Sequence, residues 1–402
     1  MKIIVQKFGG TSVKDEESRL RAQSHIKSAL QDDYKVVVVV SAMGRKGDPY
    51  ATDTLQSLVN GAQISSREQD LLLSCGETIS AIVFSNMLNA NGIAAIALTG
   101  AQAGFLTNEE HTNAKIVEMK CDQVLEKLET HDVVVVAGFQ GISRAGEITT
   151  LGRGGSDTSA SALGAALNAE YIDIFTDVDG VMTADPRIVE GAKPLAVMTY
   201  TEICNLAHQG AKVIHPRAVE IAMQAKVPLR VRSTYSYGTG TLVTSMVENK
   251  KGSDILDRVI TGIAHVPNIT QITVSFVEGH YNIQTEVFKA MAQEGISVDF
   301  INISPTAIIY TVMDKMTDRA ITVLQDLGYE PKVIRNCAKV SAVGAGMTGV
   351  PGVTARIVNA LSKEGIQILQ SADSHTTIWV LVREEDMVRA VNSLHDEFCL
   401  EN

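Results

Sequence analysis

The chain has 402 residues, of which 45% are hydrophobic and 20% charged, so it is long enough for two or three domains that each bury a core. Its net charge of −11 argues against a nucleic-acid binder or a membrane-surface protein. Its cysteines form no CxxC pair, its N-terminus lacks a signal-peptide pattern, and no apolar run approaches the roughly 18–20 residues of a membrane span, so we expect reduced thiols and a cytoplasmic location.

The residues up to about 245 alternate between strand and helix patterns. Strands are predicted at 3–5, 36–40, 93–98, 133–137 and 171–175, and helices at 16–30, in a stretch ending near 90, at 113–128 and at 157–168. The valine runs at 36–40 and 133–136 indicate strands covered on both faces. This alternation predicts an α/β fold with an open, mostly parallel sheet and helices on both faces.

The C-terminal part repeats itself after the polar stretch MVENKKGSD (246–254), which reads as a linker. EVFKAMAQEGISVDFINIS (286–304) resembles RIVNALSKEGIQILQSADS (356–374), although a chance match between two amphipathic helices is the alternative. Each copy has a strand before it and a strand pair and helix after it, which predicts two ferredoxin-like βαββαβ units. The expected domains are 1–245, 258–335 and 336–402.

The first strand leads into KFGGTSV (7–13), where a Gly-Gly pair would let the backbone approach a ligand closely. Lys7 and the two hydroxyl residues beside it suggest that this ligand is an anion such as phosphate. The spacing differs from the Walker pattern, in which the lysine follows the glycines. The alternative is a solvated lysine beside an ordinary turn.

Two further motifs stand where ligands of open α/β sheets bind. Ser41 begins SAMG, directly after the five-valine strand, where a plain turn would fit equally well. GRGGSD (152–157) precedes an alanine-rich helix that Ser156 or Asp157 would cap. Arg153, between glycines, offers a fork suited to a carboxylate; the alternative is a capped helix with an exposed arginine.

Acidic and basic residues elsewhere complete the candidate set. TDVDGVMTADPR (176–187) would hold a nucleotide or Mg²⁺, or would form an acidic surface turn. Glu77, near a predicted helix start, would accept a substrate ammonium or serve as a first-turn acid. Lys212 would reach a phosphate, whereas His215 is interpreted as structural. No HExxH or zinc-spaced Cys/His set occurs, and we predict no dedicated metal site.

Together, KFGGTSV, SAMG, TTLGRGGSDTSA, TDVDGVMTADPR and AKVIHPRA resemble the motifs of the bacterial aspartate kinases, members of the amino-acid kinase family. The match runs through nearly the whole chain, and the C-terminal repeats resemble paired ACT regulatory domains. The resemblance implies transfer of the ATP γ-phosphate to the side-chain carboxylate of L-aspartate, giving 4-phospho-L-aspartate. This is the first committed step toward lysine, diaminopimelate, threonine and methionine, with feedback inhibition by an end-product amino acid.

The resemblance also implies roles for individual residues. Lys7 would hold the transferred phosphoryl group, oriented by Asp157, and Mg²⁺ would bridge phosphate oxygens. The implied aspartate contacts are Ser41, Thr52 (or Thr54), Glu77, Arg153 and Ser156. The implied ATP contacts are Lys7, Phe8, Gly9, Gly10, Thr176, Asp177, Asp179, Gly180, Val181, Asp185, Arg187 and Lys212.

The ACT resemblance implies an effector site near residues 277–282 and 297–302, with Ser297, Asp299 and Asn302 as contacts, and a homodimer joined through these domains. Lysine, threonine and diaminopimelate all remain open as effectors. An internal start at Met246, as some relatives use, is not decided by one methionine. The alternatives are a kinase for glutamate, N-acetylglutamate or UMP, or an amino-acid sensor with an inactive kinase half. A dehydrogenase is disfavoured because no GxGxxG follows the first strand.

Overall fold

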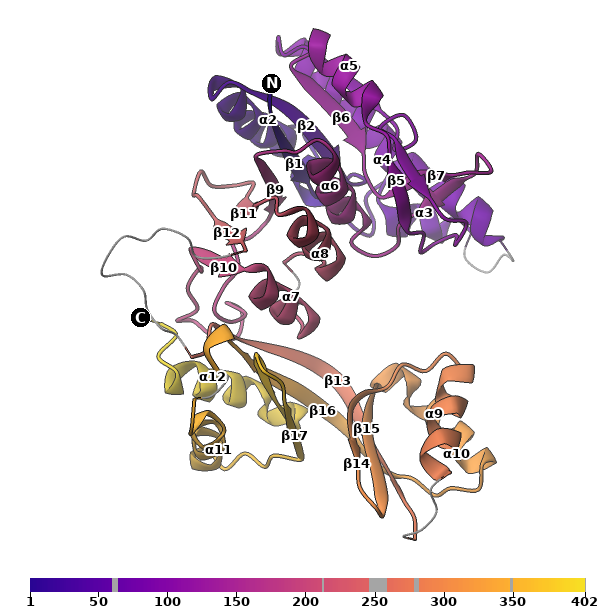
Figure 1. The fold of residues 1–402 in the computed structure, drawn as a ribbon, viewed down its shortest axis with the longest axis vertical. Coiled ribbons are helices and arrows are strands. Elements are labelled where there is room, and N and C mark those ends of the chain that lie inside the picture. The colour runs from indigo at the N-terminus through magenta and orange to yellow at the C-terminus, as the bar shows by residue number, and fades with distance from the viewer. Residues whose placement is uncertain (60–63, 212, 246–258, 278–281, 348–349, 402) are drawn as a thin grey trace. The chain divides into compact units, whose positions relative to one another are not determined.

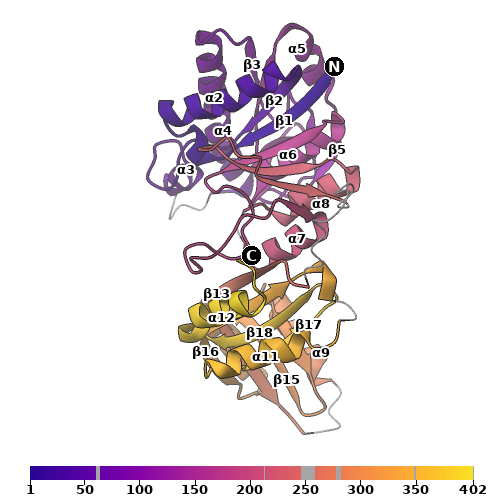
Figure 2. The same ribbon diagram turned by 90° about the vertical axis from the view of Figure 1, so that its left-hand side faces the viewer.

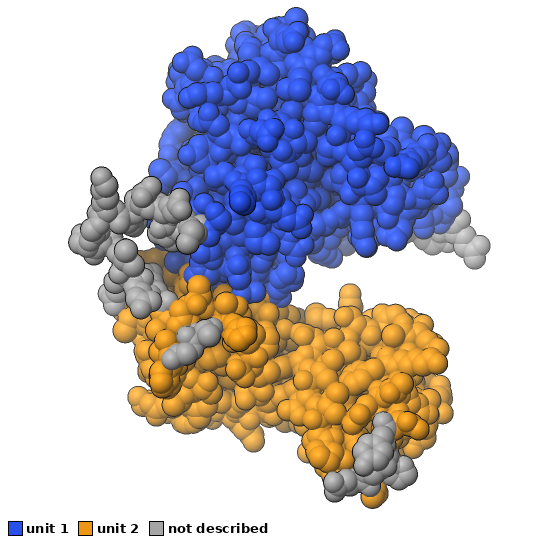
Figure 3. Space-filling model, viewed as in Figure 1, with its two compact units in different colours: residues 1–181, 194–208, 212–255 blue, residues 182–193, 209–211, 256–402 orange. Residues whose placement is uncertain are grey.

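The computed structural model describes residues 1–59, 64–211, 213–245, 259–277, 282–347 and 350–401. The chain divides into two compact units (Figures 1 and 3). The first unit comprises 1–181, 194–208 and 212–255, and the second comprises 182–193, 209–211 and 256–402. The predicted linker, with Met246, lies outside the described residues.

The first unit is built on an eight-stranded sheet of order β10-β12-β11-β9-β1-β2-β6-β3, in which only the pairing of β11 with β12 is antiparallel. Its strands are β1 (Lys2–Phe8), β2 (Tyr34–Val40), β3 (Ala95–Leu98), β6 (Val133–Ala137), β9 (Tyr171–Thr176), β10 (Val197–Thr199), β11 (Leu229–Ser233) and β12 (Thr241–Thr244). The valine runs of β2 and β6 are fully buried, as expected for strands covered on both faces. The predicted fold class is confirmed.

Helices cover both faces of this sheet (Figure 2). The helices are α1 (Gly10–Val13), α2 (Glu16–Gln31), α3 (Thr52–Ser57), α4 (Ser66–Ala90), α5 (Asp122–Thr130), α6 (Gly155–Ala166), α7 (Tyr200–His208) and α8 (Pro216–Ala225). Ile26 of α2 and Phe84 of α4 share one core with Phe8 of β1. On the opposite face, Gly164 of α6 packs so closely on Ile172 of β9 that a Cβ there would lie 2.3 Å from its side chain.

Helix α4 corrects one expectation from the sequence. Its 25 residues include a window with a mean hydropathy of 1.5, so by length and composition it is long and apolar enough to cross a membrane. Half of that window is buried inside the protein. A core helix passes the same test, and Phe84 and Leu88 of α4 lie in the core beneath the sheet. The burial of these side chains explains the apolar composition.

The predicted helix at 113–128 is wrong over its first half. Residues Ile116–Met119 form strand β5, and the helix α5 begins only at Asp122. β5 pairs with β4 (Phe105–Thr107) in a separate sheet of order β5-β4-β7-β8, which also contains β7 (Gln140–Ser143) and β8 (Ile148–Thr150). Antiparallel pairing with the nearby strand β4 overrides the local helix preference of these residues.

The second unit contains a six-stranded antiparallel sheet of order β14-β15-β13-β16-β18-β17. Its strands are β13 (Gly262–Ser275), β14 (Asp299–Ile303), β15 (Ala307–Met313), β16 (Lys332–Val343), β17 (Gln370–Asp373) and β18 (Thr377–Arg383). Its α-helices are α9 (Ile283–Gln293), α10 (Thr317–Asp326), α11 (Val353–Lys363) and α12 (Met387–Glu397).

The two repeats of this unit share their central strands instead of following one another as closed units. β13 pairs with β16 through both of its halves, Gly262–Val266 with residues 339–343 and residues 269–273 with residues 332–337, and its second half also pairs with β15. Both long strands bend at an asparagine with a left-handed backbone, Asn268 (φ 60°) and Asn336 (φ 53°). The expected division at 335–336 therefore lies inside β16.

Part of the predicted nucleotide segment belongs to the second unit. Ala184 and Val189 lie in one hydrophobic core with Leu361 of α11 and Val391 of α12. Thus residues 182–193, although they directly follow the Thr176–Val181 stretch in the chain, pack as part of the second ACT-like repeat.

Candidate active site

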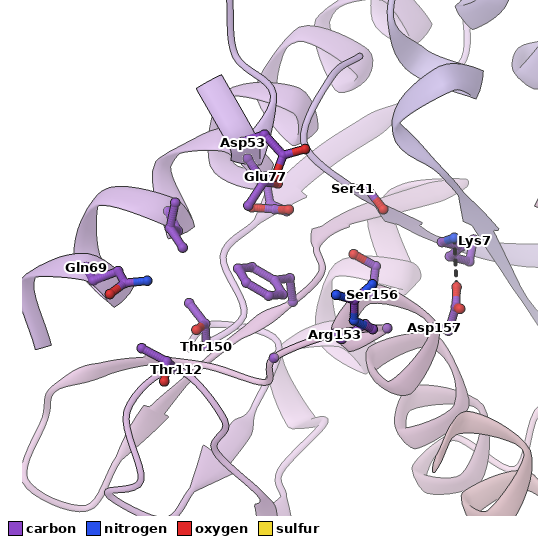
Figure 4. A pocket seen from close by; sticks show the side chains of 16 residues that line it. Lys7, Ser41, Asp53, Gln69, Glu77, Thr112, Thr150, Arg153, Ser156 and Asp157 are labelled. Carbon is purple, nitrogen blue, oxygen red and sulfur yellow. Dashed lines mark ion pairs between the residues drawn. The ribbon is translucent and has the colours of Figure 1, made fainter. Parts of the chain in front are cut away.

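A cleft of about 440 Å³ opens in the first unit (Figure 4). Seven of the predicted site residues line it: Lys7, Ser41, Thr52, Glu77, Arg153, Ser156 and Asp157. These residues come from five separate segments of the chain, at the ends of β1 and β2 and on α3, α4 and the 152–157 turn. The cleft lies at the carboxyl ends of β1 and β2, where open parallel sheets bind their ligands.

Lys7 and Asp157 form an ion pair inside the cleft. The Nζ of Lys7, near the end of β1, lies 2.7 Å from Oδ1 of Asp157 in the first turn of α6, and 13% of each side chain is exposed. The backbone N–H of His215 donates to the second carboxylate oxygen of Asp157 at 3.3 Å. Asp157 is thus held from one side by backbone and fixes the lysine ammonium on the other (Figure 4).

Of the two glycines that follow Phe8, Gly10 is required by the closeness of the neighbouring loop. Gly10 has no room for a side chain, because a Cβ would lie 2.5 Å from the carbonyl oxygen of Gly44 and 2.6 Å from that of Ala42. Gly9 is the residue before α1, and a Cβ there would lie 3.5 Å from the Nζ of Lys7. Phe8 turns into the core and stacks on Phe175, so only its backbone is available to a ligand.

Glu77 is a buried acid with one free oxygen. The backbone N–H of Ala42 donates to its Oε1 at 3.0 Å, whereas Oε2 has no hydrogen-bond partner among the described residues. Burial raises the pKa of Glu77 to about 8, and the Ala42 hydrogen bond opposes this only in part. Figure 4 shows the carboxyl group pointing into the cleft beside Asp53. Such a group is suited to meet a cation that enters the cleft.

Arg153 and the threonines occupy other parts of the wall. Arg153 is exposed, in the turn before α6, and Ser156 lies beside it in the first turn of that helix (Figure 4). Thr52 lines the cleft, whereas Thr54 accepts a hydrogen bond from the backbone N–H of Gly47 at 3.2 Å. The placement favours Thr52 over Thr54 as the residue facing a ligand.

The predicted nucleotide residues after β9 do not line this cleft. In the first unit, Asp177 pairs with Arg45 (2.9 Å) and Asp179 accepts from the hydroxyl of Ser236 (2.6 Å). The remaining residues of this segment in the first unit are Thr176, Gly180 (φ 140°) and Val181, whose N–H donates to Thr241.

In the second unit, Asp185 pairs with Arg187 at 2.6 Å, which lowers the pKa of Asp185. Lys212 lies outside the described residues.

The predicted effector residues lie along an edge strand of the second unit. Asp299 and Asn302 belong to β14, Ser297 precedes it, and all three are exposed. β14 pairs with β15 alone among the described strands. An edge strand leaves backbone groups available to a ligand or to another chain. The other predicted effector segment is 277–282, of which residues 278–281 lie outside the described residues.

Sequence reasoning missed a group of residues that also line the cleft. These are Asp53, Gln69, Leu73, Thr112, Phe139, Thr150, Gly152, Gly154 and Gly155. The sequence contains a signal for one of them. Phe139 comes shortly after the buried strand β6, just as the predicted site residue Ser41 comes after β2. The structure adds that Phe139 has a left-handed backbone (φ 67°), which is uncommon for a bulky residue.

The charges around the cleft suit a substrate that carries both a positive and a negative group. Arg153 and Lys7 offer cations, and Glu77 offers an acid that can become an anion. No three His, Cys, Asp or Glu side chains converge as metal ligands within the described part of the chain. The arrangement can therefore bind a small zwitterion next to a lysine that neutralises developing negative charge.

Comparison with known proteins agrees with this chemistry. The amino acid kinase family model matches residues 2–233, and an ACT domain model matches residues 332–396. Aspartokinase 1 of Bacillus subtilis (strain 168) is 70% identical over 400 residues, covering 99% of each chain. The chain belongs to the aspartokinases of the amino acid kinase family. The aspartokinase of Geobacillus stearothermophilus is 41% identical over 410 residues, covering 100% of this chain and 98% of its own.

Solved aspartokinase structures share the fold over almost the whole chain. E. coli aspartokinase III in complex with aspartate and ADP (R-state) has a TM-score of 0.79 and 27% identity, covering 98% of this chain and 99% of its own. The same enzyme in complex with lysine and aspartate (T-state) has a TM-score of 0.77 and 26% identity, with the same coverage. The resemblance to aspartokinases with ACT domains is confirmed.

Proposed function

We propose that this protein is an aspartate kinase that converts ATP and L-aspartate into ADP and 4-phospho-L-aspartate. The observation that carries the proposal is that the Lys7–Asp157 pair shares one cleft with Arg153 and Glu77. The 70% identity to an aspartokinase over the full chain supports it independently. The reaction is the first step toward lysine, diaminopimelate, threonine and methionine.

The substrate needs no general base, because the side-chain carboxylate of aspartate is already ionised at neutral pH. One of its oxygens attacks the γ-phosphorus of ATP, the bond from that phosphorus to the β–γ bridging oxygen breaks, and ADP leaves with the electron pair. The barrier comes from bringing anions together and from charge on the transferring group. The ammonium of Lys7 stabilises that charge, and Asp157, 2.7 Å away, keeps it in place.

The two ends of the amino acid are held by groups of opposite charge. The guanidinium of Arg153 binds a substrate carboxylate, and the free oxygen of Glu77 receives the ammonium. Ser41, Thr52 and Ser156, which line the same cleft, supply hydrogen bonds. With these contacts, the substrate would lie between Lys7 and Glu77.

ATP is assigned to the loop that follows β1 and to the segment that follows β9. The amides of Gly9 and Gly10 and the ammonium of Lys7 would meet its phosphates. The other proposed contacts are Phe8 through its backbone, Thr176, Asp177, Asp179, Gly180, Val181, Asp185, Arg187 and Lys212. Mg²⁺ would neutralise phosphate charge, held mainly by phosphate oxygens, because the carboxylates of this segment already have protein partners.

Regulation is assigned to the second unit. We infer feedback inhibition by lysine, threonine or diaminopimelate bound near Ser297, Asp299 and Asn302, with β14 as the place where two chains join in a homodimer. The three expected domains, 1–245, 258–335 and 336–402, would be one catalytic domain and two ACT domains. Five free cysteines and an acidic surface fit a cytoplasmic enzyme without a membrane or nucleic-acid partner.

One assay tests this function. ADP release is measured with aspartate, glutamate, N-acetylglutamate and UMP in parallel, at saturating ATP with Mg²⁺. We expect release with aspartate alone. Release with another acceptor would assign a different amino-acid kinase, and release with none would favour a sensor whose kinase half is inactive.

A further inference from the structure

A buried carboxylate outside the predicted site anchors one wall of the cleft. Asp70 lies in the second turn of α4, and none of it is exposed. The backbone N–H of Thr112 lies 3.0 Å from both of its oxygens, and the hydroxyl of Thr150 donates to Oδ1 at 2.5 Å. The Nδ1 of His111 lies 2.8 Å from Oδ2. A carboxylate with this many donors in a dry site fixes all of them in space.

The donors to Asp70 belong to the cleft wall itself. Thr112 and Thr150 both line the cleft. Gly152 follows shortly after Thr150 with a left-handed backbone (φ 74°), and a Cβ there would lie 2.9 Å from Oδ1 of Asn113 and 3.1 Å from the carbonyl oxygen of Thr112. The loop held by Asp70 therefore touches the turn that carries Arg153.

A second charge, which is partly buried, holds the same two segments from α8. The Nη1 of Arg217 donates to the carbonyl oxygen of Leu151, and its Nη2 to that of Ala114, each at 3.1 Å. The N–H of Ala114 also donates to the carbonyl oxygen of Thr150 at 2.8 Å. The wall is thus a single body, and Asp70 attaches it to α4, beside the hydrogen bond from Nε2 of Gln140 to the carbonyl oxygen of Ser74 (2.8 Å).

Helix α4 also carries Glu77, about two turns after Asp70. We propose that Asp70 is a positioning residue that sets the separation between Glu77 and Arg153. It would thereby match the cleft to the distance between the ammonium and the carboxylate of the substrate. This inference rests on the proposed function, because it takes Glu77 and Arg153 as the groups that bind the two ends of aspartate.

The first test is Asp70→Asn, which keeps the shape of the side chain. Its amide has one acceptor in place of two, and its N–H₂ group faces donors. We expect the KM for aspartate to rise by about 10–100-fold, because a displacement of about 1 Å in a group that positions the substrate can cost up to about 100-fold. The KM for ATP and kcat should change much less, and the preference for aspartate over glutamate should fall.

A milder pair of variants tests the hydrogen bond between Thr150 and Asp70 by itself. Thr150→Val removes one donor to Asp70 without changing any charge. Thr149→Val is its matched control, because Thr149 is adjacent, equally buried, bonded to Thr107 (2.6 Å) and absent from the cleft wall. We expect Thr150→Val to raise the KM for aspartate and Thr149→Val to leave it unchanged, with similar effects of the two on thermal stability.

The outcomes separate this inference from a merely structural role. An unchanged aspartate KM in Asp70→Asn, or a loss of kcat and stability without any KM effect, overturns it. If Asp70→Asn does not fold, the pair at 149 and 150 decides, and equal KM values for both overturn it. A wild-type protein that releases no ADP with aspartate overturns the proposed function and this inference together, whereas an active wild type beside unaffected variants overturns this inference alone.

Discussion

The Nζ of Lys339 lies 2.5 Å from Oδ2 of Asp299 and joins the central strand β16 to the edge strand β14. Only 8% of the lysine side chain is exposed, against 67% of the aspartate side chain. The corresponding residue in the second repeat is Leu369, so the repeat itself does not require an acid at this place. Asp299 is therefore already paired, yet it remains open to a second cation from solvent.

Asp299→Ala should give an active enzyme that escapes feedback inhibition. If the exposed side of its carboxylate receives the ammonium of the effector, its loss should weaken inhibition by roughly 10–150-fold, a typical range for coupling between two sites. The measurement is inhibition by lysine, threonine and diaminopimelate, singly and in pairs, on both proteins. An effector that inhibits both proteins at the same concentration would remove Asp299 from the site.

The Lys339 pair requires a control, because Asp299→Ala leaves a buried ammonium without its partner. Lys339→Met removes that ammonium and keeps Asp299. We expect this variant to remain sensitive to the effector. Should both variants lose inhibition to the same extent, the ion pair within the sheet would be the cause, and direct effector binding by Asp299 would be refuted.

Lys7→Ala should nearly abolish turnover while the protein stays folded. The ammonium lies where negative charge develops, and the loss of one such contact typically lowers the rate by about 10²–10³-fold. Lys2→Ala is the control, since Lys2 belongs to the same strand but its side chain is exposed and weakly paired with Glu170 (4.0 Å). A near-normal rate for Lys7→Ala at saturating ATP and aspartate would exclude the proposed role.

Arg153→Ala should raise the KM for aspartate far more than the KM for ATP. The guanidinium is assigned to a substrate carboxylate, and Arg153→Lys should recover little, because an ammonium lacks the planar fork. Arg144→Ala, an exposed arginine that does not line the cleft, serves as the control. If ATP binding weakens in Arg153→Ala and aspartate binding does not, the 152–157 turn and the loop after Lys7 have been assigned the wrong ligands.

How far the sequence predicts the structure depends on the sequence distance between partners. The valines of β2 indicate a buried strand by themselves, and the Lys7 and Asp157 motifs are recognisable by resemblance. Asp70 gives no such signal, because its partners Thr112 and Thr150 lie 42 and 80 residues away. β5 was missed for another reason: its partner β4 is close in the chain, with Thr107 paired to Ile116, but the residues of β5 also fit a helix pattern and only this pairing makes them a strand.

The pH dependence of aspartate binding should report on Glu77. Burial raises the pKa of its carboxyl group to about 8, so at pH 7 the empty cleft holds mainly the neutral acid. An ammonium pairs with the carboxylate and not with the acid, so binding must release a proton. The KM for aspartate should therefore fall as pH rises from 6 to about 8, by up to about tenfold per pH unit, and then level off.

Glu77→Gln separates this linkage from other effects of pH. The amide can still accept the N–H of Ala42, but it neither titrates nor carries a charge. We expect a higher KM for aspartate that no longer changes between pH 6 and 8, while the KM for ATP stays close to that of the wild type. Calorimetry of aspartate binding at pH 7, in buffers with different heats of ionisation, should detect close to one proton released by the wild type and none by the variant. A wild-type KM that is constant over this range, or binding without proton release, would show that Glu77 is already ionised in the empty cleft or does not meet the ammonium.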